Sequence, residues 1–245
     1  MNCSNPLISC ICITSNRPIT LQRALACFQR QDYPNTELVI SYPEDDLLTK
    51  AVIDQIESSS IIRLIRIIHP KEEQLMLTKN TAINAAGGDF ICIWNSDHWH
   101  HVNRISDQYR VLKNSPFRSS TLMHILLFDF KNQQTFYSAY RNWEETLLCE
   151  KQILLQAIYM DIERTNDHPV LHFLSAKNLL YHISESPHLY IYVYYHHNRF
   201  DEAHYQNCFF QSVLLEDINE TVQDVVNMDY YLLGGLKSQS RFWDI

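Results

Sequence analysis

Residues 6–41 read "PLISCICITSNRPITLQRALACFQRQDYPNTELVIS", and this stretch decides the fold. Its opening, residues 6–14, is apolar and rich in β-branched side chains, which is typical of a strand buried on both faces. A helix is expected to follow from Pro18, because apolar residues then recur at helical spacing until residues 32–35 stop it. Residues 36–41 predict a second buried strand. The stretch therefore predicts a strand, a helix and a strand in succession.

The same alternation continues through the first half of the chain. A helix is expected around 49–57, a strand at 61–68, a helix at about 75–86 and a strand at 89–95. The pair Gly87 and Gly88 is expected to end the helix before it as a C-cap. Strands that alternate with helices indicate a parallel, doubly wound sheet, whose ligands bind beyond the carboxyl ends of its strands.

The second half has a mixed pattern. Residues 121–130 and 135–140, with the polar turn 131–134 between them, predict a β-hairpin. The other expected elements are helices at 150–159, 170–176, 201–212 and 218–232, and an aromatic strand at 189–195. Phe242 and Trp243 in the tail suggest either contact with a membrane surface or a homodimer, with core packing as the alternative.

Composition excludes several classes of function. The 245 residues carry a net charge of -8, which argues against nucleic-acid binding because phosphate contacts need clustered Lys and Arg. Only four glycines occur, so neither a dinucleotide fingerprint nor a Walker A loop can be written. The seven cysteines form no C-x-x-C pair and are expected to be reduced thiols. Without a signal peptide or an apolar run of about eighteen residues, we expect a cytoplasmic protein with a small-molecule partner.

Asp97 is the first candidate for chemistry. It follows an apolar strand in "ICIWNSDHWHH", residues 91–101, where a carboxylate at the end of a strand could meet a diphosphate and a divalent cation. The alternative is an aspartate that caps a helix starting near Val102. His98, His100 and His101 lie beside it, but their spacing gives no tetrahedral zinc set, so a structural or surface role is expected for them.

Two blocks of this sequence resemble family 2 inverting glycosyltransferases with the GT-A fold. Residues 6–41 are similar to the opening of that family, and "LTKNTAINAAGGDFICIWNSDHW", residues 77–99, is similar to the block that leads into its Asp-x-Asp metal motif. The resemblance implies an α/β fold of the GT-A type: a Rossmann-like, mostly parallel sheet with helices on both faces, a mixed acceptor half and C-terminal helices. The expected domain spans 1–212, with a nucleotide-sugar half at 1–110 and an acceptor half at 111–212, before a helical extension at 213–245.

The resemblance also implies a donor pocket. Thr14, Asn16 and Arg17 would line the nucleotide, and Lys79 would offer positive charge to its phosphates in place of the family's Arg. The family's acidic contact with uracil or ribose falls among Glu44, Asp45 and Asp46, with the choice among the three left open. For each of these residues the alternative is a solvated loop or helix-start position.

The metal motif departs from the family pattern, because Asn95, Ser96 and Asp97 stand where the family has Asp-x-Asp. Asn95 can still hydrogen-bond a ribose, and Ser96 is placed with it in the donor site. Asp97 becomes the only carboxylate of this motif for Mn²⁺ or Mg²⁺, so a second protein ligand is expected. His196 is the preferred one, with His197 in reserve.

By the same resemblance, Asp167 is the expected general base, with Asn166 beside it where the family has Glu. The alternative for Asp167 is an N-cap of the helix that Pro169 begins. Trp143, Glu144 and Asn166, with Glu145 as an option, are candidates for binding the acceptor. Packing under the hairpin is the alternative for Trp143, because large aromatic side chains are mostly buried.

The expected activity is inverting transfer of a hexosyl or N-acetylhexosaminyl group from a UDP- or GDP-type donor, with UDP preferred. The acceptor would be a hydroxyl of a glycan, a lipid-linked sugar or a glycoprotein in polysaccharide biosynthesis, in the cytoplasm or peripherally at the inner face of the membrane. Two alternatives remain: a binding module that keeps nucleotide or glycan recognition without catalysis, and a sugar-1-phosphate nucleotidyltransferase. The second ranks last because its Gly-rich phosphate loop is missing.

Overall fold

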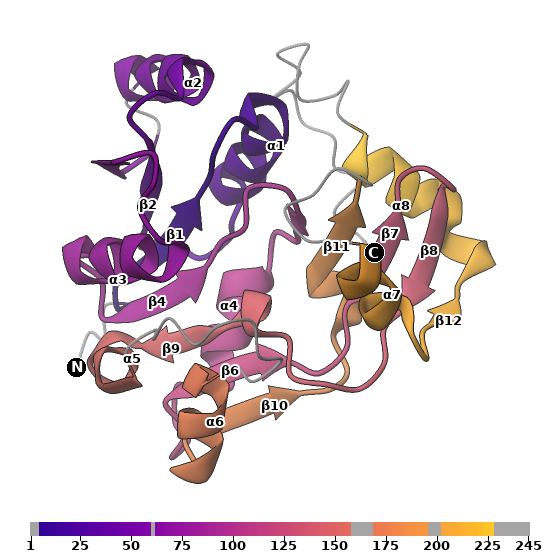
Figure 1. Ribbon diagram of the computed structural model, residues 1–245. Coiled ribbons are helices and arrows are strands. Elements are labelled where there is room, and N and C mark those ends of the chain that lie inside the picture. Colours follow the sequence, from indigo (N-terminus) through magenta and orange to yellow (C-terminus); the bar gives the residue numbers. More distant parts are fainter. Residues whose placement is uncertain (1–4, 60–61, 158–168, 196–201, 228–245) are drawn as a thin grey trace.

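Two β-sheets stand side by side in the computed structural model, which describes residues 5–59, 62–157, 169–195 and 202–227 (Figure 1). The larger sheet has seven strands in the order β10-β6-β9-β4-β1-β2-β3, and the smaller has five in the order β12-β8-β7-β11-β5. The strands are β1 (Ile8–Ile13), β2 (Thr36–Pro43), β3 (Leu64–His69), β4 (Phe90–Ile93), β5 (Trp99–His100), β6 (Ser119–Leu122), β7 (Leu126–Asp129), β8 (Gln134–Tyr137), β9 (Leu148–Glu150), β10 (Leu180–Ile183), β11 (Tyr190–Tyr194) and β12 (Val213–Leu214). The α-helices are α1 (Pro18–Gln29), α2 (Leu47–Ser59), α3 (Leu75–Ala85), α4 (Arg104–Arg110), α5 (Lys151–Ala157), α6 (Pro169–Ala176), α7 (Glu202–Phe209) and α8 (Asn219–Val226), with 3₁₀ turns η1 (Glu144–Thr146), η2 (Pro187–Leu189) and η3 (Glu216–Ile218).

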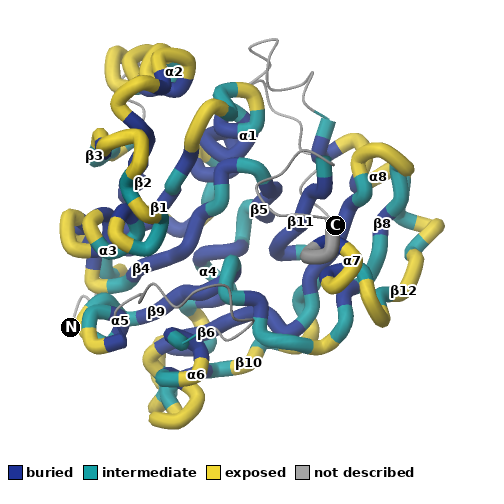
Figure 2. The backbone as a smooth tube through the Cα atoms, in the orientation of Figure 1, coloured by how far each residue is buried: buried dark blue, intermediate teal, exposed yellow. Residues whose placement is uncertain are grey.

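β1 lies at the centre of the larger sheet and pairs in parallel with β2 on one side and β4 on the other. Its side chains alternate between two cores: Cys10 and Cys12 face the core that α1 and α2 cover, and Ile11 faces the one that α3, α5 and α6 cover. Helices therefore cover both faces, as the sequence predicts, and Figure 2 shows the strands buried between partly exposed helices. β9 is the antiparallel member, so the sheet is mostly rather than wholly parallel.

The prediction of a glycine C-cap after α3 is wrong. Ala86 is the C-cap residue, with φ -59° and ψ 138°, and neither Gly87 nor Gly88 adopts a left-handed conformation. Gly88 is needed for close approach instead, because a Cβ there would lie 2.5 Å from the Ser9 Oγ and 2.7 Å from the Leu7 carbonyl oxygen. The glycine thus lets the start of β4 pack against β1.

The predicted hairpin is confirmed only in part. β7 and β8 pair antiparallel from Leu126 to Tyr137, and the Asp129 Oδ1 accepts hydrogen bonds from two backbone N–H groups in the turn. Residues 121 and 122, expected in the same strand as β7, instead belong to β6 in the larger sheet. The chain crosses from one sheet to the other at 123–125, a change that the continuous apolar run in the sequence hides.

α8 packs into the main core rather than beside it. Val222, Val225 and Val226 are buried in the same cluster as Cys10 and Trp94. The division at residues 212 and 213 stays a prediction, but the described part of the proposed extension contributes to the packing of the first 212 residues. In the part of the chain that the structure describes, every helix falls short of the length and apolarity needed to cross a bilayer.

Candidate functional site

The candidate site lies where β1, β2 and β4 end. The Thr14 N–H donates to the Ser41 carbonyl at 3.0 Å, so the ends of β1 and β2 are level. Asn16 then turns the chain with φ 53°, a left-handed conformation that asparagine tolerates. Its backbone N–H donates to the Asp46 Oδ2 at 2.5 Å, and the Asp46 Oδ1 accepts from the Thr49 N–H at 2.9 Å. One buried carboxylate therefore holds the loop after β1 and caps α2.

The structure separates the three acids of this loop. Asp46 is buried and engaged with backbone N–H groups, whereas Glu44 and Asp45 are exposed. The Asp45 carboxylate lies 2.8 Å from the Lys71 Nζ, and this hydrogen bond lowers the pKa of Asp45. Asp46 thus has a structural role, and Glu44 and Asp45 remain the exposed candidates for the predicted contact with the donor.

Asp97 and Arg17, both predicted to face the donor, are in contact. The Arg17 Nη1 donates to the Asp97 Oδ2 at 2.9 Å, although the two residues are 80 positions apart. Their side chains are 28% and 21% exposed, so the pair is reachable from solvent. The helix-capping alternative for Asp97 is wrong, because α4 begins at Arg104 with Asn103 as its N-cap residue.

Two further residues hold Asp97 in place. Arg23 is fully buried and donates from Nη2 to the Asp97 carbonyl at 2.7 Å and from Nη1 to the Val226 carbonyl at 3.0 Å. The His98 Nδ1 accepts the Val193 N–H at 3.1 Å, which leaves Nε2 to carry the proton, 3.5 Å from the Asp97 Oδ1. Burial lowers the pKa of His98 despite the nearby Asp97 charge, so the imidazole is neutral at pH 7.

The neighbouring histidines are structural, as the sequence predicts. The His100 Nε2 donates to the Asn95 carbonyl at 3.0 Å, its Nδ1 accepts from the Arg104 guanidinium, and its ring stacks on Trp94 with a centroid distance of 3.9 Å. The His101 Nδ1 accepts the Asn103 N–H. No group of three or more His, Cys, Asp or Glu side chains in the described ranges is placed to hold a metal ion.

Asn95 and Ser96 are engaged within the protein in this structure. The Asn95 Nδ2 donates to the Tyr190 hydroxyl at 2.9 Å, and Ser96 is buried. Asp97 keeps a partly exposed carboxylate after β4, and its hard oxygens could bind a divalent cation. A single carboxylate fits a cation that also binds diphosphate oxygens, as Mg²⁺ commonly does, and does not fit a cation held by protein alone.

Lys79 in α3 is in contact with Glu144 in η1. The Lys79 Nζ lies 3.2 Å from the Glu144 Oε1, with side chains 16% and 12% exposed. Trp143 is only 1% exposed, and the Arg141 guanidinium lies 3.6 Å from its ring centroid. The indole is therefore packed in the core, and the proposed stacking on an acceptor sugar is not available to it in this structure.

Four predicted site residues lie outside the described residues. They are the proposed base Asp167, its neighbour Asn166, the preferred metal ligand His196 and its reserve His197. Sequence reasoning also missed one residue that the structure brings to the site, Arg23. Its signal was an arginine within the apolar stretch of α1, between Leu21 and Ala24.

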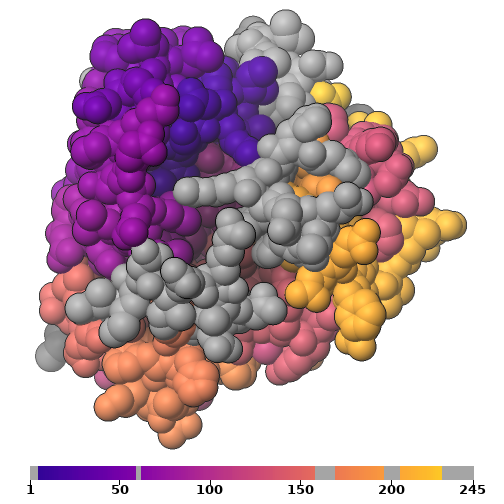
Figure 3. Space-filling view, in the orientation of Figure 1, coloured from indigo at the N-terminus to yellow at the C-terminus, as the bar shows by residue number. Residues whose placement is uncertain are grey.

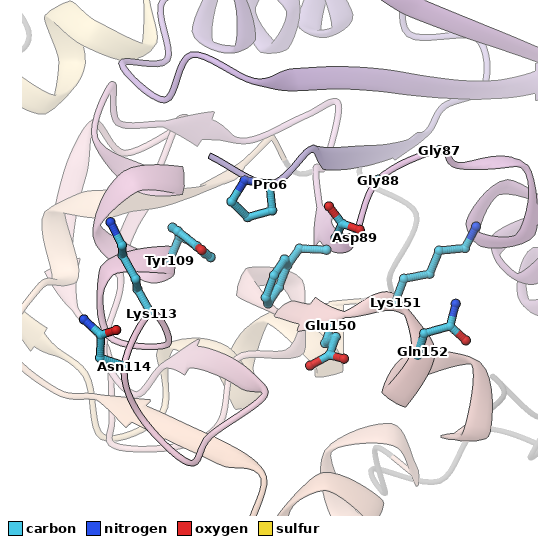
Figure 4. Close-up of a pocket in the computed structure, with 11 residues that line it drawn as sticks. Pro6, Gly87, Gly88, Asp89, Tyr109, Lys113, Asn114, Glu150, Lys151 and Gln152 are labelled. Atoms are coloured by element: carbon cyan, nitrogen blue, oxygen red, sulfur yellow. The ribbon is translucent and has the colours of Figure 1, made fainter. Parts of the chain in front are cut away.

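A pocket of about 720 Å³ lies at the opposite end of the strands (Figure 4). It is lined by Pro6 before β1, by Gly88 and Asp89 before β4, and by the polar side chains of Lys113 and Glu150, among others. Because Arg17 and Asp97 follow β1 and β4 rather than precede them, this pocket is separate from the candidate site.

A mostly parallel sheet with helices on both faces and a smaller sheet beside it form an α/β architecture of the GT-A type. The chain belongs to glycosyl transferase family 2, whose sequence model matches residues 9–184. No curated protein matches the sequence.

Solved structures with the same fold have low sequence identity. A mannosyltransferase, PcManGT from Pyrobaculum calidifontis in complex with GDP-Man and Mn²⁺, has 13% identity and a TM-score of 0.63, over 94% of this chain and 70% of that chain. S. aureus TarS 1–349 with UDP has 13% identity and a TM-score of 0.58, over 80% and 68%. The same TarS fragment with UDP-GlcNAc has 12% identity and a TM-score of 0.63, over 91% and 72%.

Proposed function

We propose that this chain transfers a hexosyl or N-acetylhexosaminyl group from a nucleotide-sugar donor, first among them a UDP-sugar, to a hydroxyl of a glycan, a lipid-linked sugar or a glycoprotein. The observation that carries the proposal is the Arg17–Asp97 contact. It brings a guanidinium and a carboxylate together beyond the C-terminal ends of the strands, where ligands of such sheets bind. The neighbours bound to UDP, UDP-GlcNAc or GDP-Man support a donor of this class.

In the proposed reaction each residue has a separate task. Arg17 and Lys79 offer positive charge to the donor diphosphate, with the guanidinium suited to two phosphate oxygens at once. Glu44 or Asp45 accepts hydrogen bonds from the base or the ribose. A Mn²⁺ or Mg²⁺ ion held by Asp97 would supply further positive charge against the leaving diphosphate.

Asp167 is the proposed general base, and a single attack by the acceptor in line with the departing diphosphate makes the transfer inverting. The acceptor oxygen forms a bond to the anomeric carbon while Asp167 takes its proton, and the bond to the diphosphate breaks with the electron pair leaving on the phosphate oxygen. His196 is proposed as the second protein ligand of the cation.

The test compares two aspartates in similar surroundings. Asp97 and Asp107 have side chains 21% and 22% exposed and carboxylates 2.9 and 3.0 Å from an arginine nitrogen. With UDP-sugars, Mn²⁺ and a panel of acceptors, Asp97→Asn is expected to lower the rate of UDP release at least about 100-fold, the scale of losing one electrostatic contact in a transition state. Asp107→Asn should keep the wild-type rate, and an unchanged rate in Asp97→Asn would refute the proposed site.

A binding module without transferase activity is the second candidate. It is favoured by Asn95, whose side-chain amide is bound to Tyr190 where the family has a charged ligand. Tight UDP binding without turnover across the same donor and acceptor panel would support this function over transfer. Cytoplasmic location, peripheral contact with the inner face of a membrane, a homodimer and a role in polysaccharide biosynthesis remain predictions.

A further inference from the structure

Each basic side chain predicted to meet the donor diphosphate is already paired with an acid in the described part of the chain. Arg17 contacts Asp97 at 2.9 Å, and Lys79 contacts Glu144 at 3.2 Å. Without a donor the pocket is thus close to electrically neutral at these positions. Asp97, the carboxylate expected to hold a cation, has its charge compensated by Arg17.

We propose that Arg17 makes cation binding depend on the nucleotide, an inference that rests on the proposed function. In the donor-free protein Arg17 neutralises Asp97, so a free divalent cation gains little there. The donor diphosphate draws the Arg17 guanidinium to itself, and Asp97 then becomes a ligand for the cation that the diphosphate carries. The cation and the nucleotide bind as one unit.

The surroundings of the pair determine which partner moves. Asp97 is held through its carbonyl by the buried Arg23 and has the neutral His98 beside its other carboxylate oxygen. Arg17 lies on the loop after β1, with a side chain 28% exposed and its backbone at φ -132° and ψ 55° just before α1. In the proposed exchange the Arg17 guanidinium, on the more exposed side chain of the two, shifts toward an entering phosphate, whereas Asp97 stays after β4.

Charge and geometry both favour this exchange. Arg23 adds a second positive charge behind Asp97, which further opposes a free cation at that carboxylate. A diphosphate brings several negative oxygens, and a guanidinium binds two of them with parallel hydrogen bonds. Reciprocal linkage then requires that the nucleotide raise cation affinity by the same factor by which the cation raises nucleotide affinity.

The experiment measures Mn²⁺ binding by electron paramagnetic resonance of the free ion, with and without UDP, so it needs no activity. Without UDP, the wild type is expected to bind Mn²⁺ weakly and Arg17→Gln about tenfold more tightly, the scale of releasing a partly exposed carboxylate from one ion pair. Arg17→Lys, which keeps the charge, should stay near the wild type. With Mn²⁺ present, Arg17→Gln should bind UDP about tenfold more weakly.

Two controls separate the possible explanations. Arg110→Gln breaks the Arg110–Asp107 pair elsewhere on the surface and should change neither affinity. The double variant Arg17→Gln with Asp97→Asn should lose the gain in Mn²⁺ affinity, which assigns that gain to Asp97. Circular dichroism of each variant checks that it folds.

Equal Mn²⁺ affinity in the wild type and Arg17→Gln without UDP overturns this inference but not the proposed function, since it shows that Arg17 does not weaken cation binding at Asp97. A wild type that binds no UDP at any Mn²⁺ concentration overturns the proposed function, and the nucleotide-driven step with it. The Mn²⁺ titration without nucleotide still distinguishes the two failures.

Discussion

His100 shows how one buried side chain supports the site without touching it. It bridges the Asn95 carbonyl and the Arg104 guanidinium, and the arginine also donates from Nη2 to the Ile93 carbonyl at 2.8 Å. A proton on Nδ1 would point at the guanidinium. Burial first, and then the Arg104 charge, therefore hold the pKa of His100 well below its usual value. The loop that carries Asp97 is ordered by a neutral imidazole.

This residue predicts a pH dependence of stability. The pKa of His100 in the folded state lies below the unfolded value of about 6.5. Below that pH the imidazole therefore binds a proton in the unfolded chain but stays neutral in the folded one. The free energy of unfolding should then fall by up to about 1.4 kcal/mol per pH unit for this group. In urea unfolding at pH 7.5, 6.5 and 5.5, the stability gap between the wild type and His100→Gln should narrow as the pH falls. A stability gap that stays constant across these pH values for His100→Gln would contradict the prediction.

At the level of elements, α8 is connected to the site through a single buried arginine. Arg23 on α1 spans from the Val226 carbonyl at the end of α8 to the Asp97 carbonyl after β4. Val222, Val225 and Val226 fix α8 against the main core. The position of α8 thus influences the position of Asp97. The residues of α8, Asn219–Val226, are 122 to 129 positions after Asp97 in the sequence.

Val225→Ala is expected to lower the free energy of unfolding by about 1–3 kcal/mol, because it leaves a cavity in the shared core. Val213→Ala, in the exposed strand β12, should have little effect. Guanidinium unfolding monitored by tryptophan fluorescence measures both, since Trp94 lies in the same cluster as Val225. Equal stabilities of the two variants would show that α8 is not part of the cooperative core.

At the scale of the whole molecule, the site lies between parts of the chain that are distant in sequence. Figure 3 shows the early part of the chain, in indigo to purple, at the upper left of the face in view, and the later elements, in orange to yellow, below it and to its right. The Lys79–Glu144 pair joins α3 in the first half to η1 in the second, with both side chains largely buried. The pair therefore contributes to the alignment of α3 with η1, which come from the two halves of the chain.

A double-mutant cycle tests that contribution. Lys79→Met and Glu144→Gln are each expected to lower stability, and the double variant should lose less than the sum, with a coupling of about 1 kcal/mol for a partly buried pair. The exposed Lys50–Asp54 pair of α2 provides the comparison and should couple more weakly, because solvent screens both charges. A coupling no larger than that of the surface pair would remove Lys79–Glu144 as a link between the halves.

Local sequence was sufficient for β1 to β4, for α1 to α3 and for the position of Asp97. The alternation of apolar strands with helical spacing depends on residues close in sequence, and a polar triplet after a buried strand must lie at the edge of the sheet. Two predictions, the glycine C-cap and the first strand of the hairpin, are wrong because they depend on contacts between segments distant in sequence rather than on a local pattern. Gly88 serves close packing against β1, and the apolar run 121–130 divides between two sheets.

The amino-acid sequence by itself determined the family, the α/β architecture and the candidate residues Arg17, Lys79 and Asp97. Only the tertiary structure decided how these residues are paired, which of the three acids after β2 is structural, and that Arg23 holds Asp97. The physical reason is the strand order β4-β1-β2, which brings the ends of strands together that lie far apart along the chain. Contacts across those ends depend on which strands are neighbours, and no local pattern of residues records that.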